Sequence, residues 1–275
     1  MATIPVLALL TRRNRPLIPH WLRQSLLALN IAALTATLTY SSPSAFALSK
    51  NELENSLPDS GTVDKLAKSK VGMPFIDSLA SAASNLHDYQ CFCQLFTVKQ
   101  NKWKDYGGAF VSFKQRELLR AEIKSLDYRN GSVVVRQSDG ALRGKGGGTL
   151  SLVKMTLQPD SRSLRLPTGF SLAKSDFLSL SAALKQQVAG GAVATVSQPV
   201  RLAPFKEPVM ILLMRDKNGG EEGAVGSSFV HVVYLNPKTK IPIAWNTYKD
   251  GQPNAFVFFD QLDFNKGLSD SLFTL

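Results

Sequence analysis

Histidine and cysteine are the scarce residues of this sequence, and both shortages limit its chemistry. Among 275 residues there are three His and two Cys. His20 lies in the N-terminal leader, so only His87 and His231 remain for a site elsewhere. A hydrolytic triad needs a nucleophile, a base and an orienting acid, and neither a nucleophile elbow nor a metal-binding helix motif is present. We therefore expect a non-catalytic protein without metal or cofactor, and we interpret His231 as structural.

Acidic residues are missing from the first 47 residues. Arginines between residues 12 and 23 precede an apolar run over residues 25–40, and Ala45-Phe46-Ala47 follows as a small-x-small site. This pattern predicts a secretory signal peptide over residues 1–47, cleaved near Ala47. The alternative is a transmembrane anchor, but the run is shorter than the roughly 20 apolar residues of a bilayer span. We expect an exported protein, periplasmic or extracellular, with peripheral rather than integral membrane contact.

Charge of one sign also dominates the remainder of the chain. The leader carries four Arg and no acid, so 28 basic and 21 acidic residues remain, a net charge of +7. A moderate positive charge favours anionic membrane surfaces or acidic partners. Export argues against a nucleic-acid partner.

The two cysteines, Cys91 and Cys93, fall in a segment expected to be a strand. Residues i and i+2 of a strand share a face, and a disulfide between them would strain the extended backbone. We interpret them as two small apolar side chains on one face. The alternative is a redox or intermolecular role, because free thiols are unusual in exported proteins.

Hydrophobic periodicity divides the chain into a polar N-terminal segment, residues 48–69, and a single domain, residues 70–275. Helical spacing predicts helices over 74–86 and 175–188, the second with Ser175 as N-cap and with Gly190 at its end. Aromatic and β-branched runs between turn signals predict strands over 88–99, 109–114, 118–126, 132–137, 149–157, 193–202, 209–215, 228–235, 241–248 and 255–263. Asn130-Gly131 marks a hairpin. The pattern indicates an α+β fold, a curved antiparallel sheet with helices on one face.

A glycine-rich stretch over residues 139–148, DGALRGKGGG, resembles a phosphate loop only superficially. The phosphate loop requires four residues between its first and second glycines and Ser or Thr after the Lys. Here three residues separate Gly140 from Gly144, and Gly146 follows Lys145. We interpret this stretch as a connection between strands.

A space between a curved sheet and its helical cover is a natural site for an apolar ligand. The strands carry alternating apolar residues that either fill the core or line such a space, and the sequence leaves both roles open. The candidate ligand-binding residues of this kind are Phe92, Phe110, Phe113, Ile123, Val133, Leu152, Met210, Leu212 and Val232.

Several motifs in order resemble a known family. They are DYQCFCQLFTVKQ, FVSFKQRELLRAEIKS, YRNGSVVVRQSDGALRG, LPTGFSLAKSDFLSLSAAL and the ending VVYLNPKTKIPIAWNTYKDGQPNAFVFFDQLDFNKGLSDSLFTL. Together they resemble the periplasmic lipoprotein-carrier superfamily, the LolA/LolB-like proteins, and most closely an allied group of uncharacterised exported bacterial domains. The resemblance covers about residues 70–275.

The resemblance implies an incomplete antiparallel β-barrel closed by helices, with an apolar cavity for lipoprotein acyl chains. It also implies that Leu268, Leu272 and Phe273 pack against the end of the barrel, with Ser269 or Asp270 capping a helical turn. Carriers have an Arg-Pro pair that governs opening. Here Arg116 stands in the comparable stretch without the Pro, and it is a further candidate site residue.

The resulting hypothesis is an exported, non-catalytic protein that binds a lipid or a lipoprotein acyl chain, as carrier or sensor. The alternative is a structural or protein-interaction domain of the cell envelope, whose barrel is filled by its own side chains and which has an envelope protein as partner.

Overall fold

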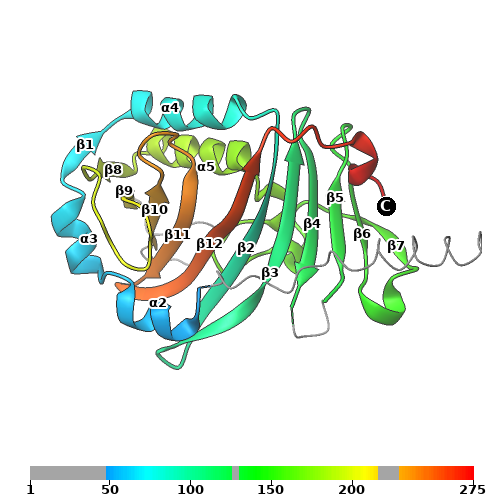
Figure 1. The fold of residues 1–275 in the computed structure, drawn as a ribbon, viewed down its shortest axis with the longest axis horizontal. Coiled ribbons are helices and arrows are strands. Elements are labelled where there is room, and N and C mark those ends of the chain that lie inside the picture. Colours follow the sequence, from blue (N-terminus) through cyan, green and yellow to red (C-terminus); the bar gives the residue numbers. More distant parts are fainter. Residues whose placement is uncertain (1–47, 126–129, 216–228) are drawn as a thin grey trace, which may run out of the picture. The chain divides into compact units, whose positions relative to one another are not determined.

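One antiparallel sheet of twelve strands organises the described part of the chain (Figure 1). The computed structural model describes residues 48–125, 130–215 and 229–275, so the predicted leader and its cleavage site lie outside the described residues. These described residues belong to one compact unit. The strand order is β1-β8-β9-β10-β11-β12-β2-β3-β4-β5-β6-β7, and β1 and β7 stay at opposite edges. The sheet is therefore curved but open, which confirms the predicted fold class.

The bounds of the elements are as follows. The strands are β1 (Ser69–Val71), β2 (Asp88–Lys99), β3 (Lys102–Lys114), β4 (Leu118–Lys124), β5 (Val133–Arg136), β6 (Leu142–Lys145), β7 (Lys154–Leu157), β8 (Val193–Val196), β9 (Met210–Arg215), β10 (Phe229–Leu235), β11 (Pro242–Lys249) and β12 (Gln252–Phe264). The α-helices are α2 (Lys50–Ser56), α3 (Ser60–Leu66), α4 (Met73–Ser84) and α5 (Phe177–Ala189). The 3-10 turns are η1 (Gly148–Leu150), η2 (Arg162–Leu164), η3 (Leu172–Lys174) and η4 (Asp270–Phe273).

The hairpin of β2 and β3 turns at a different place from the one the sequence suggests, since Tyr106-Gly107-Gly108, between the strands predicted over 88–99 and 109–114, is the expected turn there. The turn is at Gln100-Asn101, where both residues have positive φ, 53° and 57°, as a two-residue hairpin turn requires. Strand β3 instead continues through Gly107 and Gly108 with a shift of register against β2. The expected turn was wrong because glycines inside a strand can mark a bulge as well as a turn.

The glycine-rich stretch also differs from expectation. It contains β6, which pairs with both β5 and β7, although the sequence predicts only a connection there. The strand predicted over 149–157 is limited to β7, because Gly148–Leu150 form the 3-10 turn η1. The strand predicted over 193–202 ends at Val196.

Both faces of the sheet are covered, which corrects the expectation of helices on one face. The inner core lies beneath α4 and α5 and includes Leu212, Val233 and Trp245. The outer core lies beneath α2, α3 and the segment 197–209, and alternate residues of the same strands point into it. Two-sided burial of these strands explains their nearly continuous hydrophobic runs.

The segment 48–69, predicted as a polar N-terminal segment, supplies part of the outer core. Leu53 and Val63 are fully buried. Ser49 and Glu52 form a capping box at the start of α2, and Asp59 caps α3 by accepting a hydrogen bond from the Thr62 amide. Two short capped helices thus present one buried aliphatic residue each, too few for helical periodicity to be evident in the sequence.

The C-terminal turn packs as the resemblance implies. Ser269 caps η4, and Phe273 is buried while Leu268 and Leu272 are half-buried. These apolar groups form a small cluster with Leu118, Val133 and Val135. The turn therefore covers the outer face of β4 and β5.

Candidate functional site

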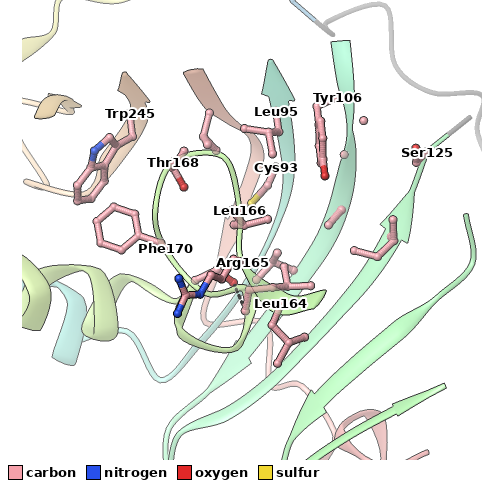
Figure 2. A pocket seen from close by; sticks show the side chains of 18 of the residues that line it. Cys93, Leu95, Tyr106, Ser125, Leu164, Arg165, Leu166, Thr168, Phe170 and Trp245 are labelled. Carbon is pink, nitrogen blue, oxygen red and sulfur yellow. Dashed lines mark hydrogen bonds between the residues drawn. The ribbon is translucent and has the colours of Figure 1, made fainter. Parts of the chain in front are cut away.

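An apolar pocket lies between the inner face of the sheet and an irregular segment, residues 163–175, that covers it (Figure 2). Its cavity volume is about 100 Å³. The sheet wall comes from β2, β3, β4, β11 and β12, and Leu180 of α5 also contributes. The lining residues are Cys93, Leu95, Tyr106, Gly107, Gly108, Ala109, Val111, Ile123, Ser125, Ser163, Leu164, Arg165, Leu166, Thr168, Phe170, Leu172, Ser175, Leu180, Trp245, Val257 and Phe259.

The two glycines of β3 shape the sheet wall. Gly107 has a φ of +116°, and a Cβ there would approach the Ser125 side chain to 3.0 Å. A Cβ on Gly108 would lie 2.4 Å from the Phe92 ring on the outer face. Because neither position has room for a side chain, this part of the wall is bare backbone, and Tyr106 and Ser125 border it.

The cover is a short loop closed by its own hydrogen bonds. The Leu166 amide donates to the Phe170 carbonyl at 2.8 Å, and Gly169, with φ of 89°, donates back to Leu166. Asn254 of β12 donates a side-chain hydrogen bond to the Pro167 carbonyl at 3.0 Å. The loop thus places Leu164, Leu166 and Phe170 against the sheet wall.

Aromatic residues close one end of the pocket. Phe170 meets Trp245 edge-on, with 4.9 Å between ring centroids. Trp245 Nε1 lies 3.2 Å from His231 Nδ1, and Gln187 Nε2 lies 3.3 Å from His231 Nε2. His231 is buried. Both of its ring nitrogens therefore have a neutral neighbour within hydrogen-bond distance.

Cys91 and Cys93 do lie on one face of β2, with 3.6 Å between their Sγ atoms. Both are free thiols. The hydrogen bond with Cys93, together with burial, raises the pKa of Cys91 well above its usual value. Cys91 is thus held as a thiol in the core, while Cys93 is half-buried and lines the pocket.

The chemistry of this pocket is that of apolar contact. Among the described lining residues, the titratable ones are Cys93, Tyr106 and Arg165, and the last two are exposed. Across residues 48–125, 130–215 and 229–275, no three His, Cys, Asp or Glu side chains are grouped as metal ligands would be. None of the helices in these ranges has both the length and the hydropathy of a membrane span.

The candidate residues named from the sequence are dispersed over the sheet. Of them, Ile123 lines the pocket. Phe113 and Leu212 belong to the inner core, and Met210 packs against it. The others lie elsewhere. Phe92 and Phe110 face each other on the outer side of the sheet, with ring centroids 5.1 Å apart, and Val232 is in the outer core. Val133 is under the C-terminal turn, and Leu152 and Arg116 are exposed, the latter in the turn after β3.

The cover residues were missed because the sequence of 159–169 has no regular period. A usable signal was the pair Leu164 and Leu166 before Pro167-Thr168-Gly169-Phe170. Apolar residues around a Pro-x-Gly turn are unusual for an exposed loop, and they indicate a loop that packs on something.

Comparison with known proteins gives similar structures but no sequence match. No family model and no curated protein matches this chain. An uncharacterised conserved protein from Thermus thermophilus has 13% identity and a TM-score of 0.44, covering 73% of this chain and 90% of that one. A LolA-superfamily protein from Nitrosomonas europaea has 13% identity and a TM-score of 0.37, covering 74% and 98%.

A putative outer membrane lipoprotein-sorting protein domain from Vibrio parahaemolyticus has 11% identity and a TM-score of 0.39, covering 74% of this chain and 96% of that one. These values describe a likeness of fold.

Proposed function

We propose that this protein is an exported carrier or sensor that binds a lipid or the acyl chain of a lipoprotein between the sheet and the 163–175 cover. The observation that carries the proposal is the apolar pocket, in which bare backbone at Gly107 and Gly108 faces Leu164, Leu166 and Phe170. The buried residues of its lining provide apolar contact area, and none of them carries a charge. The resemblance of the sequence motifs to lipoprotein carriers supports the same class of ligand.

Transfer of methylene groups from water drives this binding. Each buried methylene contributes roughly 0.8 kcal/mol, so a chain of about 16 carbons gains on the order of 10 kcal/mol before the costs of association. The cavity of about 100 Å³ is smaller than the roughly 300 Å³ at the lower end of ligand pockets. A full acyl chain therefore requires the 163–175 cover to move outward, so that binding selects a more open conformation.

A second candidate function is favoured by the same small volume. If the pocket is only the gap left by an interior filled with side chains, the protein is a structural or interaction domain of the cell envelope with a protein partner. The two functions differ in whether a lipid is bound at all.

Native mass spectrometry of residues 48–275, purified without detergent, tests the proposal. We expect a co-purifying acyl-containing mass, or a mass shift after incubation with palmitate or phosphatidylglycerol. Ala109→Phe places a ring in the pocket and should abolish the shift, whereas Phe110→Ala, on the outer face, should retain it. An unchanged apo mass under all conditions would favour the interaction domain.

A further inference from the structure

Exposed apolar side chains concentrate at one edge of the sheet. Within the described residues, seven large hydrophobic side chains are exposed, and four of them lie between residues 150 and 155. Leu152 is 91% exposed, Leu150 is 59% exposed, and Val153 and Met155 are about half exposed. We call these four residues the apolar tip. Such clustering on a small surface is characteristic of a contact site, unlike single exposed apolar residues.

The apolar tip is a folded turn. Leu150, Leu152 and Val153 lie in the connection between β6 and β7 and Met155 lies in β7, at the free edge of the sheet (Figure 1). The Val153 amide donates to the Leu150 carbonyl at 3.0 Å, and Leu150 donates to Gly147 at 3.1 Å. A Cβ on Gly147 would lie only 1.8 Å from the Asn130 carbonyl oxygen, so the chain is pressed against the neighbouring hairpin there. The fold therefore presents these side chains to solvent from a fixed base.

Basic residues predominate on β6 and β7 beside the tip, with Glu122 of β4 in register with Lys145 through Val133. The sequence from Gly140 to Pro159 has Arg143, Lys145 and Lys154 and no acid. Lys145 and Lys154 are directly opposite in the pairing of β6 and β7. Lys154 reaches the carbonyl oxygen of Leu275, and Arg143 is exposed. The tip is thus an apolar projection with cations at its base.

The tip is also connected to the pocket. Ser125, which lines the pocket, donates its amide to Asn130 Oδ1 at 3.3 Å. Asn130 in turn is the residue against which Gly147 packs. The same rim of the sheet therefore carries the partly exposed pocket residue Ser125 and the apolar tip.

We propose that the apolar tip docks the protein on an anionic lipid surface, with Leu150 and Leu152 entering the interface and Lys145 and Lys154 facing the head groups. A bilayer receives protruding leucines without a complementary pocket, and basic residues add attraction to anionic head groups. A protein partner would need a matching groove and acidic groups. This docking does not depend on a ligand being bound in the pocket.

Flotation of residues 48–275 with vesicles tests the docking. Vesicles of phosphatidylcholine with about 30% phosphatidylglycerol should carry the protein, and vesicles of phosphatidylcholine alone should carry much less. Leu150→Ser with Leu152→Ser should weaken partitioning about tenfold or more, because two leucines no longer leave water. Val193→Ser, a half-exposed apolar residue on β8, is the matched control and should leave partitioning unchanged.

Charge is tested separately. Lys145→Gln with Lys154→Gln should weaken partitioning by about fivefold per lysine and reduce its sensitivity to salt. Lys68→Gln with Lys70→Gln, both exposed near the opposite edge, is the control and should change neither.

Two results would overturn the docking. One is equal partitioning of the leucine variant and the parent protein. The other is a dimer in sedimentation velocity that the leucine variant abolishes, without any binding to vesicles, which would assign the tip to a second copy of the chain. Ala109→Phe separates this inference from the pocket: it should lose palmitate binding and still float with the vesicles.

Discussion

Arg136 of β5 and Asp176 form a buried ion pair, with 2.9 Å between Nη2 and Oδ2. Asp176 also caps α5 by accepting hydrogen bonds from the amide and hydroxyl of Ser179. Arg136 donates further to the carbonyl oxygens of Glu117 and Ala173. The pair thus fixes the start of α5 and the end of the pocket cover to the far half of the sheet.

Removing the cation should therefore be costly. Arg136→Met leaves Asp176 buried without its counter-charge, and we expect a loss of about 3–5 kcal/mol in the free energy of unfolding. Urea denaturation followed by circular dichroism measures it. The exposed pair Lys185–Asp77 is the control, and Lys185→Met should cost less than about 1 kcal/mol. Equal losses for the two variants would contradict a special role for the buried pair.

The buried hydroxyl of Tyr248 should make the folded state less stable at alkaline pH. Burial, and then the negative charge of Asp59, raise the pKa of Tyr248 to about 12. Its hydroxyl donates to the Pro58 carbonyl at 3.0 Å. Between pH 10 and 12 the unfolded state has released this proton and the folded state retains it, so stability falls as pH rises through this window, by about 2 kcal/mol.

The measurement is urea denaturation at pH 9, 10 and 11 in parallel with the phenolate absorbance. Tyr248→Phe should lose about 1 kcal/mol at pH 7, for the missing hydrogen bond. It should then show a smaller decline above pH 10 than the parent. An equally steep decline in both proteins would assign the effect to other groups, such as Tyr89 and Tyr234, whose pKa values burial also raises.

The sequence predicted the sheet, α4 and α5 because those elements are long enough for periodicity to show. It missed the second covered face, since α2 and α3 bury only one aliphatic residue each. It also placed the N-cap of α5 at Ser175, whereas Asp176 caps the helix. Ser and Asp are both favourable N-cap residues, so residue type does not distinguish Ser175 from Asp176. The ion pair with the distant Arg136 holds Asp176 at the start of the helix.

The candidate site was harder to predict for a physical reason. Alternation within a strand shows which of its residues share a face. It does not show whether Phe92 of β2 and Phe113 of β3 lie on the same face of the sheet unless the register of the two strands is known. The register of β2 and β3 shifts between Asp105 and Gly107, and Phe92 faces outward while Cys93 and Leu95 face the pocket. Eight of the 21 lining residues come from the irregular cover, for which no periodicity exists.

The burial of Phe273 leads us to expect that the C-terminal turn η4 contributes to the stability of the fold. The side chain is buried against Val133 and Val135, and Arg120 donates to the carbonyl oxygens of Leu272 and Thr274. Phe273→Ala should cost about 3 kcal/mol of unfolding free energy, through lost burial and a residual cavity. Phe110→Ala, at a 42% exposed phenylalanine, should cost less than about 1 kcal/mol. Similar urea midpoints for Phe273→Ala and the parent would show that the turn frays without consequence.

The two cysteines offer a direct probe of the pocket. Cys93 lines it and is half-buried, whereas Cys91 is buried and its pKa is raised, so the nucleophilic thiolate is disfavoured there. We expect iodoacetamide to modify Cys93 first, with Cys91 modified only after denaturation, as measured by peptide mass spectrometry. Palmitate should slow the modification of Cys93 if it occupies the pocket. Cys91→Ser provides the control, because it keeps Cys93 as the sole thiol and removes any disulfide between the two. Unchanged labelling of Cys93 at a palmitate concentration that shifts the native mass would place the bound chain elsewhere on the protein.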